Sequence, residues 1–264
     1  MLGAIIGDIV GSRFEFNNHR NKEFELFGRG CFATDDSIMT LAIAEALMRA
    51  KPDRSDLPEQ AVRCMQEIGR PYPDCGYGGR FMGWMYSDEP HPYNSFGNGS
   101  AMRVSACGWE ATSLEEAKAF SYAVTAVTHD HPEGIKGAEA VAVAIFMART
   151  GCDKDEICAA MEQYYNLDFC LDGIRDTYYF NETCQETVPQ AIEAFLEAED
   201  FEDAIRNAIS VGGDSDTLAA ITGSIAEAYY GVPEELRNTA LGYLDERLMD
   251  IFLRFEERMR QHND

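Results

Sequence analysis

Apolar residues recur along most of this chain at intervals of three and four residues, the spacing that gathers them on one face of a helix. The clearest example is the segment 244–259, whose apolar face consists of Leu244, Leu248, Ile251, Phe252, Phe255 and Met259. No stretch of more than four residues alternates apolar and polar side chains as a half-buried strand does. The pattern therefore predicts an all-α protein. Because no linker, low-complexity run or fixed-period repeat interrupts it, we expect one compact domain of residues 1–264.

Capping residues mark the starts of several other helices. These are predicted over residues 35–50, 55–70, 113–129, 131–150, 153–165, 185–198 and 200–212. Ser55 and Ser113 are candidate N-caps, and Ser113 is followed three residues later by Glu116, as in a capping box. Pro132 falls in a first turn, where its missing N–H costs nothing. Residues 72–104 break the pattern with Gly, Pro, Tyr and Asn, and a loop this long in a compact domain is usually functional.

The charge balance limits the kinds of partner. The 264 residues include 46 acidic and 22 basic side chains, for a net charge of −24. This balance argues against non-specific binding to nucleic acid or to anionic membranes. Binding of an anionic substrate to this acidic protein then requires local attraction, such as that of metal ions or backbone amides. The alternative without a functional role is that the excess acidic residues form a solvated acidic surface.

The N-terminal segment, the length of the apolar stretches and the cysteines indicate the cellular compartment. The start, "MLGAIIGDIVGSRFEF", does not resemble a signal peptide, and no stretch reaches the roughly 18 uninterrupted apolar residues of a spanning helix. The eight cysteines form no C-x-x-C pair, which disfavours a zinc site and suits reduced thiols. We expect a cytoplasmic monomer with no membrane association.

Two segments carry a similar acidic motif. "ATDDSIMTLAIAEAL" and "GGDSDTLAAITGSIAEA" each present a Thr and two Asp residues before or at a helix start. One Asp per helix is a common N-cap, but a cap does not explain the second. If the two helices lie side by side, Asp35, Asp36, Asp214 and Asp216 meet. Four such carboxylates repel one another unless cations join them.

The residue types favour hard divalent ions. Neither acidic segment contains Lys or Arg, and Asp and Thr offer only oxygen ligands, which suit Mg²⁺ or Mn²⁺ better than zinc. Four carboxylates balance the charge of two divalent ions. Small residues in the second helix, namely Ala219, Ala220, Gly223 and Ala226, allow a neighbouring helix to approach closely. The sequence therefore predicts a buried site for two metal ions.

The N-terminal segment adds two acidic residues, Asp8 and Glu15, whose roles the sequence leaves open. Gly3, Gly7 and Gly11 recur every four residues and mark a face where a neighbour comes close. Asp8 within this helix is either a structural hydrogen-bond acceptor or part of the site. Glu15, between two Phe residues, is either a surface carboxylate or a gate or proton acceptor beside the chemistry.

Two further motifs are weaker signals. In "SFGNGSAMRVS", the backbone amides of Gly97, Gly99 and Ser100 are candidates to cradle a diphosphate before a helix. In "THDHPEG", His129 and His131 suit structural hydrogen bonds better than metal binding. No G-x-S-x-G and no G-x-x-x-x-G-K-[ST] motif occurs, so a serine-hydrolase or P-loop interpretation has no support.

Five motifs in a fixed order resemble one family. "GDIVGSRFEF", "TDDSIMT", "GNGSAMRVS", "HDHPEGIKGA" and "VGGDSDTLAAITG" extend from residue 3 to about residue 230, and together they resemble the ADP-ribosylglycohydrolase family. The resemblance implies a compact all-α fold with two magnesium or manganese ions in a central cleft. It also implies hydrolysis of the N- or O-glycosidic bond between ADP-ribose and a protein side chain or related acceptor.

The resemblance also implies residue roles. Its metal ligands correspond to Thr34, Asp35, Asp36, Asp214, Asp216 and Thr217. Its substrate-binding positions correspond to Asn98, Gly99, Ser100, Met102, His131 and Ser215. Glu15, Asp36 and Asp214 are the catalytic candidates, with the general base left open. The acceptor, most simply arginine or serine, also stays open. The alternatives are a non-catalytic reader of ADP-ribose and a hydrolase of another small ribosyl or nucleotide compound.

Overall fold

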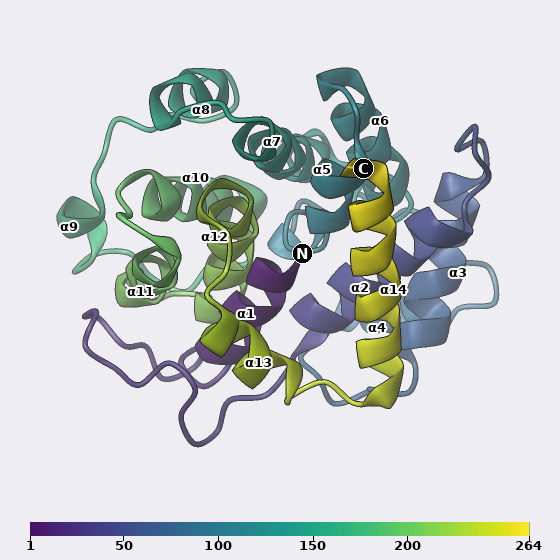
Figure 1. The fold of residues 1–264 in the computed structure, drawn as a ribbon. Helices are drawn as coiled ribbons and strands as arrows, with labels where there is room; N and C mark the ends of the chain where they lie inside the picture. Colours follow the sequence, from purple (N-terminus) through teal and green to yellow (C-terminus); the bar gives the residue numbers. More distant parts are fainter. Residues whose placement is uncertain (264) are drawn as a thin grey trace.

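A computed structural model describes residues 1–263 as an assembly of α-helices with no β-strand in that range (Figure 1). The all-α prediction is confirmed. The helices are α1 (Leu2–Gly11), α2 (Asp35–Arg49), α3 (Leu57–Gly69), α4 (Gly79–Met85), α5 (Ser105–Glu110), α6 (Leu114–Thr125), α7 (Pro132–Arg149), α8 (Lys154–Met161), α9 (Leu171–Ile174), α10 (Cys184–Leu196), α11 (Phe201–Val211), α12 (Ser215–Tyr230), α13 (Glu234–Leu241) and α14 (Glu246–Asn263), with a 3-10 turn, η1, over Asn98–Ser100.

The centre of the fold is the pair of helices α1 and α12, which lie side by side (Figure 1). Every residue of α1 is buried. A Cβ atom added at Gly7 would lie 2.0 Å from the carbonyl oxygen of Ala219, and one at Gly3 would lie 2.0 Å from that of Gly223. The two backbones are therefore in direct contact, as the four-residue glycine spacing predicts. This contact brings the N-terminus of α12 beside the C-terminal half of α1.

Replacing Gly7 by Ala is expected to lower the free energy of unfolding by about 3 kcal/mol or more, because the new methyl group meets backbone atoms that cannot rotate away. Thermal and urea unfolding measure the change. The matched control is Gly83→Ala in α4, where nothing lies within 4 Å of the added Cβ. That substitution should stabilise the helix by up to about 1 kcal/mol. Equal stability of the two variants would contradict the close approach.

The predicted caps are partly confirmed. Ser113 accepts a hydrogen bond from the Glu116 amide as the N-cap of α6, and Pro132 begins α7. The prediction for Ser55 is wrong, because α3 begins one residue later with Asp56 as its N-cap, and the Ser55 hydroxyl donates to Asp53 instead. Short helices such as α4, inside the predicted 72–104 loop, are too brief for periodicity to reveal them.

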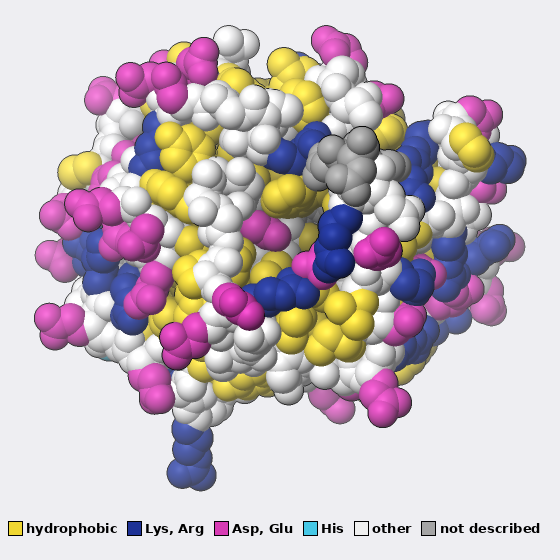
Figure 2. Space-filling view, in the orientation of Figure 1, with side chains coloured by type: hydrophobic (Ala, Val, Ile, Leu, Met, Phe, Trp, Pro, Cys, Tyr) yellow, Lys and Arg dark blue, Asp and Glu magenta, His cyan; other side chains and the backbone are white. Residues whose placement is uncertain are grey.

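The surface matches the solvated acidic exterior expected from the charge. Asp and Glu side chains are distributed around the face shown in Figure 2, with Lys and Arg between them. Among residues 1–263, no helix has the length and apolar character needed to cross a bilayer.

Candidate active site

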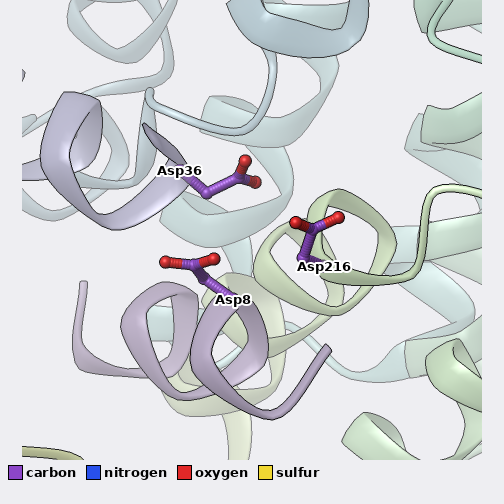
Figure 3. Close-up of side chains that lie close together, drawn as sticks. All are labelled: Asp8, Asp36 and Asp216. Atoms are coloured by element: carbon purple, nitrogen blue, oxygen red, sulfur yellow. The ribbon is translucent and has the colours of Figure 1, made fainter. Parts of the chain in front are cut away.

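The two acidic motifs meet in space, as their similarity predicts. Asp36 begins the buried part of α2, and Asp216 lies in the first turn of α12. The Thr217 hydroxyl donates to Asp36 Oδ2 over 3.3 Å and joins the two helices. Figure 3 shows that Asp36 and Asp216 point into one space, which Asp8 of α1 also enters. Three helices distant in sequence therefore supply one carboxylate cluster.

The cluster consists of two overlapping groups. In the first, one carboxylate oxygen each from Asp8, Asp36 and Asp216 lies within 4.8 Å of the others. In the second, Glu15, Asp214 and Asp216 satisfy the same limit. Asp216 belongs to both groups. Two sets of oxygen ligands sharing one carboxylate are the arrangement expected around a pair of neighbouring hard cations.

Asp214 reaches the cluster through a glycine turn. Gly212 and Gly213 have φ values of 78° and 76°, a region that residues with a Cβ rarely adopt. The turn reverses the chain between α11 and α12 and ends at Asp214. Asn98 then donates to Asp214 Oδ2 over 2.7 Å and to the Thr187 hydroxyl over 3.1 Å. The glycine-rich 97–99 segment is thereby tied to the carboxylate cluster.

Asp8 holds the start of α2 in place. Its carboxylate accepts from the Thr34 amide at 2.9 Å, the Thr34 hydroxyl at 2.5 Å and the Ser37 amide at 3.1 Å, and it also accepts from the Ser37 hydroxyl. The structural role that the sequence allowed for Asp8 is therefore present. Its membership of the first carboxylate group is the second of the two roles that the sequence left open. The available signal was a charged residue in a helix that is otherwise apolar.

The electrostatics of the cluster require a counter-charge. Burial raises the pKa of Asp214 to about 7 and that of Asp8 to about 6. Burial, followed by the charge of Asp216, raises the pKa of Asp35 and of Asp36 well above the ordinary value. Asp36 Oδ1 is buried and has no hydrogen-bond partner in the described part of the chain. An oxygen-only donor set with an orphaned buried oxygen fits a hard divalent cation.

The metal-free protein is expected to lose stability as the pH rises from about 5 to about 7. A carboxyl group whose folded pKa is raised contributes stability that is fully present below its unfolded pKa and lost as the pH passes the folded value. For Asp214 this window runs from 3.8 to about 7. We expect a decrease of about 2 kcal/mol, or roughly 4–8 °C in Tm.

Thermal unfolding in a chelator measures this dependence. Adding Mg²⁺ near pH 8 should restore the stability, because the cation favours the ionised carboxylates. Asp214→Asn should flatten the pH dependence of the metal-free protein. A metal-free Tm that rises over the same pH range would contradict the prediction.

The cluster forms the floor of a cavity of about 280 Å³. The other walls come from the loop before α4 and the first turn of α4, from the 93–103 segment, from the loop between α6 and α7, and from Glu182. The lining residues are Glu15, Asp35, Asp36, Met39, Gly76, Gly78, Gly79, Arg80, Phe81, Tyr93, Ser95, Gly97, Asn98, Gly99, Met102, Arg103, His129, Glu182, Asp214, Asp216 and Thr217. The long 72–104 loop therefore contributes much of the wall.

The predicted substrate-binding residues fall into two sets. Asn98, Gly99 and Met102 line the cavity. Ser100 and Ser215 are fully buried behind the lining, where Ser100 donates to the Gly134 carbonyl over 2.8 Å and Ser215 donates to the Gly213 carbonyl over 3.4 Å. Their side chains brace the glycine-rich turns whose backbones face the site.

The two histidines occupy different positions. His131 is the N-cap of α7, where its Nδ1 accepts from the Glu133 amide, and its ring lies 5.1 Å from that of Phe96. It does not line the cavity, whereas His129 does. Burial lowers the pKa of His129 well below the ordinary value, so the imidazole is neutral at pH 7. Nothing in the sequence distinguishes the two histidines, which are two residues apart.

A buried arginine belongs to the lining of the same cavity. Arg103 is only 1% exposed, and its Nη2 donates to the Thr128 hydroxyl over 2.6 Å. Burial lowers the pKa of Arg103 to about 10, so it remains charged at pH 7. None of the ion pairs in residues 1–263 involves this side chain. Sequence reasoning missed it, although it is the basic residue of the "GNGSAMR" motif. The cavity therefore has an acidic floor and a cationic wall.

Comparison with known proteins gives a consistent result. A model of the ADP-ribosylglycohydrolase family matches residues 1–263. The ADP-ribosylarginine hydrolase Tri1 of Pseudomonas putida (strain GB-1) is 26% identical, with the match spanning 88% of this chain and 70% of Tri1. The ADP-ribosylhydrolase ARH3 of Homo sapiens is also 26% identical, over 92% of this chain and 88% of ARH3.

A solved structure shares the fold. It is described as an ADP-ribosylglycohydrolase-related protein complex, and it superposes with a TM-score of 0.68 at 23% sequence identity, covering 98% of this chain and 96% of that chain. The family match and the two named relatives identify the protein as a hydrolase of glycosyl bonds. More particularly, the chain belongs to the ADP-ribosylglycohydrolase family.

Proposed function

We propose that this protein is a metal-dependent hydrolase that cleaves the glycosidic bond between ADP-ribose and a modified acceptor, a protein side chain such as arginine or serine, and releases ADP-ribose. The observation that carries the proposal is the buried carboxylate cluster on the floor of a cavity in a chain of this family. None of its carboxylates forms an ion pair with a basic side chain in residues 1–263, which suits the binding of a metal ion.

The proposed metal ligands are Thr34, Asp35, Asp36, Asp214, Asp216 and Thr217, holding two divalent ions, Mg²⁺ or Mn²⁺. Support comes from the convergence of Asp36, Asp214 and Asp216 within the two carboxylate groups and from the unpartnered Asp36 oxygen. Such ions, when bound, supply Lewis acidity and lower the pKa of a water molecule. Asp8 would act behind them, by fixing Thr34 and the first turn of α2.

The chain's own residues have separable roles in the proposed reaction. Glu15 is half-buried at the cavity edge, within reach of Asp214 and Asp216, and is suited to take a proton from the attacking water. Asp36 and Asp214 would stabilise the positive charge that develops on the ribose ring. The bond to the acceptor breaks through an oxocarbenium-like state, with the water oxygen joining the anomeric carbon.

The opposite wall suits the diphosphate. Gly97 and Gly99 line this part of the cavity, next to Asn98 and the guanidinium of Arg103, which forms no ion pair in residues 1–263. The Gly97 amide donates to the Ser95 hydroxyl over 3.2 Å, which makes the Gly99 amide the candidate donor to a ligand. A backbone amide and a buried cation together favour an anion there despite the net charge of the protein. Met102 would contact the ligand directly. Ser100 and Ser215 would act through the turns that they brace, and His131 would meet an outer part of the ligand beside Phe96.

An acceptor panel tests the proposed function. The protein is incubated with Mg²⁺, and separately with Mn²⁺, and with peptides ADP-ribosylated on arginine or serine and with ADP-ribosylated nucleic acid. Released ADP-ribose is quantified by chromatography. We expect release that a chelator abolishes. Failure to release ADP-ribose from every acceptor would refute the proposal, and calorimetric binding of ADP-ribose without turnover would indicate a reader.

A further inference from the structure

An exposed pair of aromatic rings belongs to the two segments that also carry the cavity-lining residues Glu15 and Glu182. Phe16 is 84% exposed and Phe180 is 37% exposed, and their rings stack with centroids 5.8 Å apart and planes inclined by 29°. The neighbouring Tyr179 is 66% exposed. A lone exposed Phe needs no explanation, but a contiguous aromatic patch indicates a contact surface.

The chain connects this pair directly to the cavity lining. Phe16 follows Glu15, and Phe180 lies two residues before Glu182, and both glutamates line the cavity. The segments that carry the two rings therefore border the carboxylate side of the cavity, where Glu15 joins Asp214 and Asp216. The Arg103 wall is formed by a different segment. An acceptor attached to the reacting end of the ligand would leave the site past these rings.

The rings are held by polar anchors on both of their segments. Asn18 donates to the Gly213 carbonyl and accepts from the Gly213 amide, each over 2.8 Å. Arg20 donates to the Tyr178 carbonyl over 2.7 Å and to the Val211 carbonyl over 2.9 Å. The two segments are thus fixed to each other and to the turn before Asp214. Because the anchors are polar, the exposed rings are not needed to hold this structure together.

The acidic residues near the two rings determine which kind of ligand group can bind there. Neither Glu15 nor Glu182 forms an ion pair in residues 1–263. Aromatic faces beside acidic side chains that no basic side chain pairs suit a planar cation, and a guanidinium combines stacking on a ring with hydrogen bonding to carboxyl oxygens. A serine acceptor carries no charge and too little side chain to cover a ring.

We propose that Phe16 and Phe180, together with Glu15 and Glu182, receive the guanidinium of an ADP-ribosylated arginine and favour arginine over serine linkages. This inference rests on the proposed function. In the reaction, the bond between the anomeric carbon and the guanidinium nitrogen breaks, and a bond to the water oxygen forms. One water proton is transferred to that nitrogen, and free arginine side chain and ADP-ribose result.

The test compares Phe16→Ala with the wild-type protein on matched arginine- and serine-linked peptides. Loss of the ring should lower kcat/KM for the arginine linkage about 3- to 30-fold, mainly through KM, and leave the serine linkage unchanged. Phe16→Tyr should restore the arginine activity. Tyr122→Ala, which removes a 55% exposed ring on α6, is the matched control and should change neither activity.

The outcomes separate this inference from the proposed function. Calorimetric binding of ADP-ribose by Phe16→Ala at wild-type affinity shows that the site itself is intact. If Phe16→Ala lowers both activities equally, or neither, or if the wild-type protein cleaves only the serine linkage, the arginine preference is overturned while the hydrolase function stands. If the wild-type protein cleaves no acceptor, the proposed function fails, and this inference fails with it.

Discussion

Replacing Asp216 by Asn is expected to lower kcat by about 10³-fold or more. Asp216 is the carboxylate shared by the two groups, one with Asp8 and Asp36 and the other with Glu15 and Asp214. The Asn amide offers one neutral oxygen in place of the two oxygens of a charged carboxylate. Metal binding at both proposed positions is therefore weakened. A loss of about 4 kcal/mol of transition-state stabilisation, in the range that a bound metal ion supplies, corresponds to this decrease.

The same substitution should have the opposite effect on the metal-free fold. Burial and the charge of Asp214 raise the pKa of Asp216 well above its ordinary value, so an ionised Asp216 destabilises the apo protein. Asp216→Asn should therefore raise the Tm measured in a chelator and remove most of the stabilisation by Mg²⁺.

Turnover assays, metal titration calorimetry and thermal unfolding together measure both effects. Asp88→Asn, on an exposed loop residue, is the matched control and should alter none of them. Retention of wild-type turnover and Mg²⁺ affinity by Asp216→Asn would rule out its role as a ligand. A loss of turnover accompanied by a lower Tm in chelator would instead indicate a damaged fold.

Replacing Glu15 by Gln is expected to lower kcat by about 10²- to 10⁴-fold, the range for removal of a general acid or base. The amide keeps the shape of the side chain but does not accept a proton at neutral pH. Glu15 is half-buried at the cavity edge, whereas Asp36, Asp214 and Asp216 are buried. Removing its charge should therefore affect catalysis more than folding or metal affinity.

Steady-state kinetics separate the possible roles of Glu15. A decrease in kcat with little change in KM and in Mg²⁺ affinity identifies a proton acceptor. Glu23→Gln, on an exposed residue of the same segment, is the control and should retain full activity. A normal kcat in Glu15→Gln would assign the proton transfer to one of the aspartates.

Local patterns in the sequence predicted more of the fold than of the cavity. The spacing of apolar residues located the long helices, because burial of one face of a helix is recorded every three or four positions. The repeated Thr and Asp motifs predicted the meeting of Asp36 and Asp216, because a second buried carboxylate beside a helix start demands a partner. The glycines at positions 3 and 7 predicted a close helix contact. Glycine lowers the stability of an isolated helix, so its repeated presence indicates that another element needs the space.

Other features depend on which elements meet, and spacing along the chain does not record that. Asp8 and Thr34 are 26 positions apart in sequence, and only the packing of α1 against α2 brings them into hydrogen-bond contact. His129 rather than His131 lines the cavity, because the turn before α7 directs one imidazole inward and uses the other as a cap.

The sequence by itself determined the long helices, the oxygen-rich acidic motifs and the family, because these follow from periodicity, residue chemistry and motif order. Only the tertiary structure decided that Asp8 joins the cluster, that Arg103 lines the same cavity, and that Phe16 stacks on Phe180. Each of these depends on the direction of a side chain between packed elements. That direction is set by contacts distant in sequence, which no local pattern contains.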